Sequence, residues 1–172
     1  EIELLYNDGQ YEKIINLVQK YENPTQDMKE LMRKSELRIA AYNEALILYK
    51  NKEYDLVLKK ILTTNYLDSQ MIIENSRSYV SHYNQSIQLF SMNLFDEAIE
   101  KIDLSNDYKD SKEKLISFKE KKNEYDKIYN QAVDRFISHK IYEAEDLFLK
   151  IKGYKDTENY IKKIEDNNIQ YK

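Results

Sequence analysis

Four positions at fixed spacing recur four times along this chain, and they constrain its fold more than any other feature. A small or aliphatic residue is followed by an aromatic residue four positions later, a second aromatic or aliphatic residue after five more, and a small or aliphatic residue after another three. The copies are Ile2, Tyr6, Tyr11, Ile14; Ala45, Tyr49, Tyr54, Val57; Ser86, Phe90, Phe95, Ala98; and Ala132, Phe136, Ile141, Ala144. Such a pattern is typical of two helices that pack through a tight turn and then stack copy on copy. The spacing therefore predicts an all-α chain of helix-turn-helix repeats.

Each copy is expected to hold a long helix, a short turn, a shorter helix and a polar loop. Apolar residues at helical spacing place the starts of the shorter helices near Tyr11, Tyr54, Leu94 and Ile141. The interval from Asp110 to Ala132 is four residues longer than its counterpart from Asp68 to Ser86. Because one helical turn has about 3.6 residues, we expect one continuous helix from about Asp110 to Ser138.

The aromatic residues of the pattern are expected to form the core. Tyr49, Phe90 and Phe136 are predicted to be buried between the two helices of their copies. Most of the 16 tyrosines also fall at repeated positions, where packing explains them. A tyrosine can bury its ring and leave its hydroxyl at a wet edge, which suits a thin layer of paired helices.

The loops that follow the shorter helices carry a second repeated signal. They read Tyr66-Leu67-Asp68-Ser69, Tyr108-Lys109-Asp110-Ser111 and Tyr154-Lys155-Asp156-Thr157. The aspartate or the hydroxyl residue is expected to cap the next helix by accepting a hydrogen bond from its free backbone N–H groups. Asp110 and Glu113 also have the spacing of a capping box.

The repeated positions and loops together resemble tetratricopeptide-type (TPR-like) repeats, in a bacterial variant whose copies end in a Tyr-Lys-Asp-Ser loop. The copy-to-copy intervals of 43, 41 and 46 residues exceed the usual period of about 34. The family's leucine before the small residue of the long helix is replaced here by Glu44, Gln85 and Gln131. The resemblance implies a right-handed α-solenoid that forms a single repeat domain over residues 1–172. Its copies are placed roughly at 1–25, 26–67, 68–109 and 110–155, with a C-terminal helix at 156–170.

Composition excludes several other classes of protein. Two glycines and one proline are too few for the turns of an all-β or doubly wound fold. The 27 basic and 31 acidic residues give a net charge of −4, which argues against a nucleic-acid partner. The longest apolar run, Ala45 to Tyr49, is far shorter than the ~20 residues that span a bilayer, so we expect no membrane insertion by this segment. The chain is expected to be a monomer in isolation.

The sequence holds no arrangement of residues that indicates an enzyme. His82 and His139 lie in different copies, without a carboxylate or a second histidine at metal-ligand spacing. Gly9 and Gly153 are the only glycines, so a glycine-rich phosphate loop is excluded. Without cysteine there is no thiol nucleophile and no thiolate metal site. We therefore predict no catalytic site, no metal and no cofactor.

One polar pattern indicates a binding surface. The pairs Tyr42-Asn43, Tyr83-Asn84 and Tyr129-Asn130 place an asparagine two residues before the small residue of three long helices. The family resemblance implies that an asparagine at this position faces the concave surface and bonds the backbone of a ligand. A side-chain amide can donate and accept at once, which suits an extended peptide. Asn43, Asn84 and Asn130 are the candidate partner-binding residues; the alternative is that they are only solvated.

The resemblance implies a non-catalytic scaffold that binds a protein or a peptide, as a module of a larger bacterial surface or membrane-anchored protein. Two other hypotheses stay open: a peptide-sensing regulatory module of a cytoplasmic signalling protein, and an accessory domain of a multidomain enzyme. The chain opens without an initiator methionine and within an expected helix, so we expect it to be a piece of a longer protein. The resemblance favours an extracytoplasmic cell-surface location over a cytoplasmic one.

Overall fold

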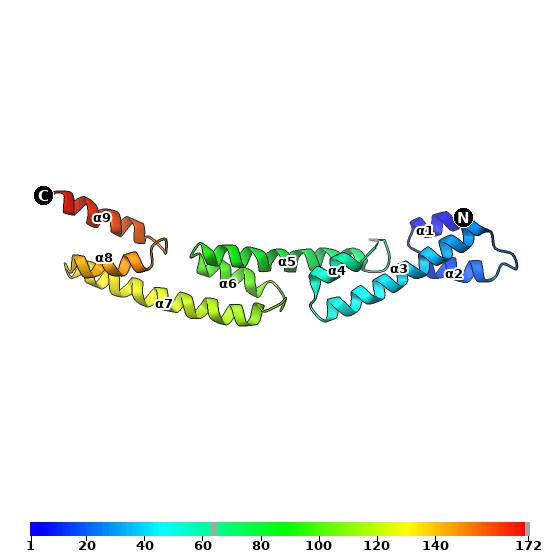
Figure 1. Cartoon of the computed structure of the whole chain (residues 1–172), viewed down its shortest axis with the longest axis horizontal. Coiled ribbons are helices and arrows are strands. Elements are labelled where there is room, and N and C mark those ends of the chain that lie inside the picture. The colour runs from blue at the N-terminus through cyan, green and yellow to red at the C-terminus, as the bar shows by residue number, and fades with distance from the viewer. Residues whose placement is uncertain (63–64, 171–172) are drawn as a thin grey trace. The chain divides into compact units, whose positions relative to one another are not determined.

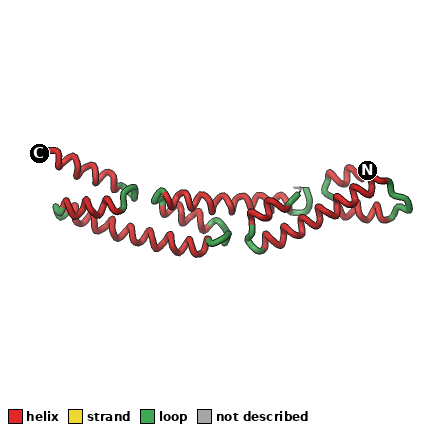
Figure 2. The backbone as a smooth tube through the Cα atoms, viewed as in Figure 1, coloured by secondary structure: helices red, strands yellow, loops and turns green. Residues whose placement is uncertain are grey.

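The computed structural model describes residues 1–62 and 65–170, with side chains described up to residue 166. Residues 63–64 and 171–172, which the predicted domain includes, lie outside the described residues. The described secondary structure is helical throughout (Figures 1 and 2). Its helices are α1 (Ile2–Asn7), α2 (Tyr11–Gln19), α3 (Gln26–Lys50), α4 (Tyr54–Lys60), α5 (Ser69–Ser91), α6 (Phe95–Asp103), α7 (Ser111–Ile137), α8 (Ile141–Lys150) and α9 (Thr157–Gln170). The predicted all-α class is confirmed for this part of the chain.

The predicted helix boundaries agree closely with the structure. The shorter helices begin at Tyr11, Tyr54, Phe95 and Ile141, so one of the four predicted starts is a single residue early. The continuous helix expected from about Asp110 to Ser138 is α7, which runs over Ser111–Ile137. The α-solenoid arrangement and its handedness stay predictions.

The chain divides into two compact units. The first contains Glu1–His82 and Ser105–Lys109, and the second contains Tyr83–Leu104 and Asp110–Lys172. Helix α5 contributes its first part to one unit and its last part to the other. In the first unit α2 and α4 pack against α3, and in the second α6 and α8 pack against α7 (Figure 1).

The same backbone turn joins α1 to α2, α3 to α4, α5 to α6 and α7 to α8. A left-handed residue lies in each turn, with φ of 71° at Gly9, 66° at Lys52, 61° at Asn93 and 59° at His139. The N–H of the next residue donates to the carbonyl five positions before it, at 2.8, 2.9, 3.1 and 2.9 Å respectively. This is the bond of a Schellman motif, which satisfies the last carbonyls of a helix. The fixed interval between the two aromatic positions is the length that this turn requires.

The core of the first unit gathers around tyrosine rings. The ring of Tyr66, in the loop before α5, lies 5.2 Å from Tyr11 and 5.0 Å from Tyr42, between ring centroids. Small and aliphatic side chains from α2 to α5 complete the cluster, with less than a tenth of each exposed: Ile14, Val18, Ala45, Val57 and Ile72. Burying a side chain of valine, isoleucine or phenylalanine size stabilises the fold by roughly 1.5–3 kcal/mol.

The core of the second unit combines aromatic stacking with very small residues. Phe90 of α5 stacks on Phe118 of α7, with 4.0 Å between ring centroids. Ala98 of α6 and Ala132 of α7, two small residues of the repeated pattern, are fully buried. At the C-terminal end, Ala132 also belongs to a further cluster with side chains of α8 and α9: Ala144, Phe148, Ile161 and Ile164.

The predicted burial of Tyr49, Phe90 and Phe136 is wrong, because all three are only half-buried. Each lies in the last turn of its long helix, beside the hairpin turn and solvent. The second aromatic position is the buried one: Tyr54 is 0% exposed and Phe95 is 2% exposed. These rings begin the shorter helices, where the tyrosine of the following loop covers them. The ring of Tyr54 lies 5.7 Å from that of Tyr108, and the ring of Phe95 lies 5.3 Å from that of Tyr154, between centroids.

The predicted aspartate cap is also wrong for the helix with the capping-box spacing. Asp110 occupies the N-cap position of α7, but its side chain makes no capping hydrogen bond. The reason is that its carboxylate accepts from a tyrosine hydroxyl of another helix instead. A side-chain cap is present at α3, where the Thr25 hydroxyl accepts from the backbone N–H of Met28 at 3.3 Å.

Candidate functional site

The three candidate asparagines lie on long helices and are exposed. Asn43 lies on α3 in the first unit, whereas Asn84 on α5 and Asn130 on α7 belong to the second. Each follows a tyrosine that is buried or half-buried. The partner-binding role of these asparagines stays a prediction.

The tyrosines beside them make a hydrogen bond that recurs in both units. The hydroxyl of Tyr83 donates to the Asp110 carboxylate at 2.5 Å, and the hydroxyl of Tyr129 donates to Asp156 at 2.6 Å. Tyr42 donates to Asp68 in the same way. Each bond ties a long helix to the loop just before the next long helix or, for Asp156, before α9. The aspartate of the repeated loop therefore holds two helices together.

These hydrogen bonds shift the pKa values of tyrosine and aspartate side chains that form them. Burial, followed by the hydrogen bond to Asp68, raises the pKa of Tyr42 to about 12. Burial and the Asp156 carboxylate also raise the pKa of Tyr129 well above its ordinary value. The hydrogen bond from Tyr83 is the largest cause that lowers the pKa of Asp110. A phenol hydroxyl that donates to a carboxylate forms a charge-assisted hydrogen bond, which is a strong kind.

The two residues of each Tyr-Asn pair thus have different surroundings. The tyrosine hydroxyl is held by an aspartate within the fold, and the neighbouring amide is exposed to solvent. Sequence reasoning identified both residue types but not the bond, because its partners are 26 or 27 residues apart. The spacing of 26 or 27 residues from each tyrosine to the loop aspartate, repeated three times, is the signal that could have indicated it.

The two histidines lie on different elements, apart from the three tyrosine–aspartate bonds. His139 is exposed in the turn between α7 and α8, and His82 is half-buried on α5. Within residues 1–62 and 65–170, no group of three or more histidine, aspartate or glutamate side chains is arranged to hold a metal ion.

A groove in the first unit is a second candidate site, and sequence reasoning did not identify it. It encloses about 520 Å³ and is called the arginine groove here. Arg38 of α3 and Arg77 of α5 supply its charged groups. Its other lining residues come from α4, from α5 and from the segment between them: Leu58, Ile61, Leu62, Asn65 and Ile73. The two arginines are brought together only by folding, so no local spacing in the sequence indicates this site.

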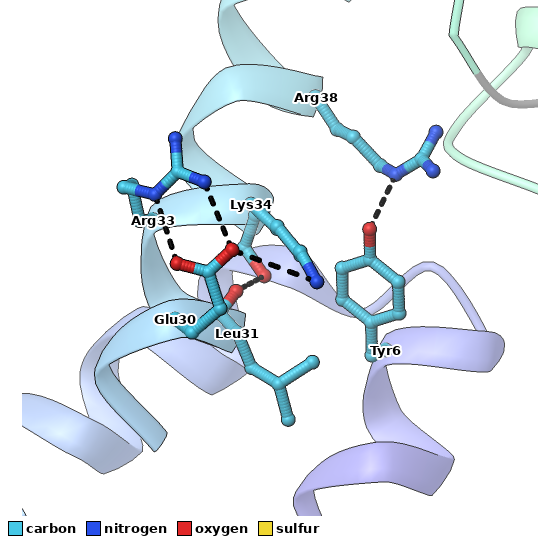
Figure 3. Close-up of polar contacts among 7 residues, drawn as sticks. Tyr6, Glu30, Leu31, Arg33, Lys34 and Arg38 are labelled. Carbon is cyan, nitrogen blue, oxygen red and sulfur yellow. Dashed lines mark hydrogen bonds and ion pairs between the residues drawn. The ribbon is translucent and has the colours of Figure 1, made fainter. Parts of the chain in front are cut away.

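The surroundings of Arg38 differ from those of the neighbouring Arg33, as Figure 3 shows. The Arg33 guanidinium donates to both carboxylate oxygens of Glu30, at 3.0 Å from Nε and 2.8 Å from Nη2. Arg38 instead donates from Nε to the hydroxyl of Tyr6 at 2.7 Å, and from Nη1 to the backbone carbonyl of Leu62. These partners position the Arg38 guanidinium but do not neutralise its charge.

Comparison of the chain with protein-family models, with curated proteins and with solved structures finds no match. No helix in the described residues is both long enough and apolar enough to cross a membrane. The residues and their geometry are therefore the basis for assigning a function.

Proposed function

We propose that this chain is a non-catalytic module that binds a protein or a peptide through the exposed asparagines of its long helices. The observation that carries this proposal is the contrast within each Tyr-Asn pair. The tyrosine is held by a carboxylate of the fold, and the adjacent amide is exposed. An exposed amide on a rigid helix can donate to and accept from a ligand backbone without rearrangement of the fold.

The proposal includes a TPR-like stacking of the helix pairs. Two repeated details support it: the Schellman turn at four equivalent positions and the tyrosine–aspartate bond at three. The Tyr-Lys-Asp-Ser loops support the further proposal that the module belongs to a larger bacterial protein exposed at the cell surface.

Selection of short random peptides displayed on phage against the chain would test the proposal. A peptide that binds the unchanged chain should bind the Asn43→Ala/Asn84→Ala/Asn130→Ala variant at least about tenfold more weakly, because ligand backbone groups lose hydrogen-bond partners.

A matched control is available in three exposed asparagines at other positions, Asn16, Asn123 and Asn159. Their triple alanine variant should bind the selected peptide as the unchanged chain does. Equal binding by both triple variants would contradict the asparagine assignment. Failure to select any peptide would contradict the proposed peptide-binding function.

A further inference from the structure

We infer that the arginine groove is a separate binding site for a peptide segment that carries an acidic side chain beside aliphatic ones. This goes beyond the function proposed above, because it uses other residues. On α3, Arg38 lies five residues before Asn43, which places the two about 140° apart around a helix of 3.6 residues per turn. A ligand in the groove would therefore leave the asparagine side of α3 uncovered.

The charges at the groove indicate an anionic ligand. Two of the chain's four arginines line it, in a protein whose net charge is −4. No carboxylate is among the described lining residues. Neither Arg38 nor Arg77 forms an ion pair within the described part of the chain, whereas Arg33 pairs with Glu30 and Arg135 with Glu143. A guanidinium matches a carboxylate in geometry as well as in charge, through two parallel N–H donors.

The aliphatic lining of the groove indicates that the ligand also carries aliphatic groups. Leu58 and Ile61, which line the groove with the arginines, are half-buried, and Ile73 is 8% exposed. Leu62, another lining residue, presents 58% of its surface to solvent, so it can cover a ligand side chain. The volume of about 520 Å³ lies within the range of roughly 300–1,000 Å³ that is usual for ligand sites.

A peptide fits this arrangement better than a free fatty acid does. A long alkyl chain requires an enclosed apolar slot that removes most of its surface from water. The arginine groove instead is lined by both polar and aliphatic side chains, with two guanidinium groups and a side-chain amide among them. An extended peptide carries a side chain at every residue, so it can present a carboxylate and an aliphatic group a short distance apart.

NMR titration of the full chain with the blocked peptide acetyl-Gly-Glu-Leu-Leu-Gly-amide tests this inference. We expect saturable shifts of the Nε–H signals of Arg38 and Arg77 and of the Ile73 methyl signals. The peptide in which Gln replaces Glu should bind at least about tenfold more weakly, because a charged hydrogen-bonded pair is lost.

Arg77→Gln is the variant of choice, because Arg77 is exposed and its side chain carries no core packing. It should bind the glutamate peptide at least about tenfold more weakly and melt at the same temperature as the unchanged chain. Arg33→Gln is the matched control on α3 outside the groove, and it should bind as the unchanged chain does.

Three results would overturn the inference: equal binding of the Glu and Gln peptides, unchanged binding by Arg77→Gln, or shifts produced by dodecanoate but not by the peptide. The alanine variants of Asn43, Asn84 and Asn130 should bind this peptide normally. Failure of the asparagine proposal and failure of this one can therefore be told apart.

Discussion

At the scale of single residues, equivalent positions in the four turns carry different constraints. Gly9 has φ of 71°, and a Cβ atom there would lie 2.0 Å from the backbone oxygen of Asn65. His139 has φ of 59° and is exposed. A residue other than glycine in the left-handed region costs roughly 1–2 kcal/mol, whether or not there is room for its side chain. The same backbone shape therefore makes glycine necessary at one turn and advantageous at another.

His139→Gly is expected to raise the free energy of unfolding by about 0.5–1 kcal/mol, because it removes left-handed strain at an exposed turn. Gly9→Ala should lower the free energy of unfolding by more than about 2 kcal/mol. The added methyl group would clash with a backbone carbonyl, and alanine is also strained in the left-handed conformation. Urea unfolding measures both changes. A destabilised His139→Gly variant would show that a contact of the imidazole stabilises the fold by more than the left-handed conformation costs.

Ser76 of α5 offers a second test at this scale. Its Oγ is buried and has no hydrogen-bond partner among the described residues. Ser76→Ala should stabilise the chain by about 1 kcal/mol, because an unsatisfied buried hydroxyl is removed and alanine favours the helix. Ser35 is the matched control, since its buried Oγ donates to the Leu31 carbonyl at 2.7 Å. Thermal unfolding measures the stability of both variants. An equal gain in stability for Ser35→Ala and Ser76→Ala would contradict this account.

At the scale of the helices, the bonds between tyrosine and aspartate explain what holds consecutive elements together. The helices themselves could be predicted from the sequence, because apolar periodicity and the scarcity of glycine and proline are local signals. The burial of Tyr49, Phe90 and Phe136 was predicted wrongly, because it depends on which ring the next loop covers. The arginine groove could not be predicted, because Arg38 and Arg77 lie on helices that meet only in the folded chain.

The bond from Tyr83 to Asp110 predicts a pH dependence of stability. The folded pKa of Asp110 is below its ordinary value of 3.8, so the unfolded chain binds the proton more readily. The stabilisation is therefore complete above about pH 5 and is lost as the pH falls through the folded pKa. Asp110→Asn should reduce the fall in the free energy of unfolding below about pH 4, measured by urea unfolding across the acid range. The same acid dependence in Asp110→Asn and the unchanged chain would show that other carboxylates cause it.

At the scale of the whole molecule, the described residues form two compact units made of helices. We expect the isolated chain to be a monomer of 20.8 kDa by sedimentation equilibrium. Far-ultraviolet circular dichroism should show well over half helix, against about a third in an average globular domain. A helical content below about half, or a dimer at micromolar concentration, would contradict this expectation.

The central claim is that each Tyr-Asn pair combines a structural residue with a binding residue, and the neighbours Tyr83 and Asn84 test it most directly. The measurement is the affinity for a selected peptide together with the melting temperature, for Tyr83→Phe and Asn84→Ala. Asn84→Ala should weaken binding by roughly 1–3 kcal/mol with an unchanged melting temperature, because an exposed helical asparagine contributes little to stability. Tyr83→Phe should bind normally but lose about 1 kcal/mol of stability with its hydrogen bond to Asp110. Unchanged binding by Asn84→Ala, or a loss of binding by Tyr83→Phe, would contradict the claim.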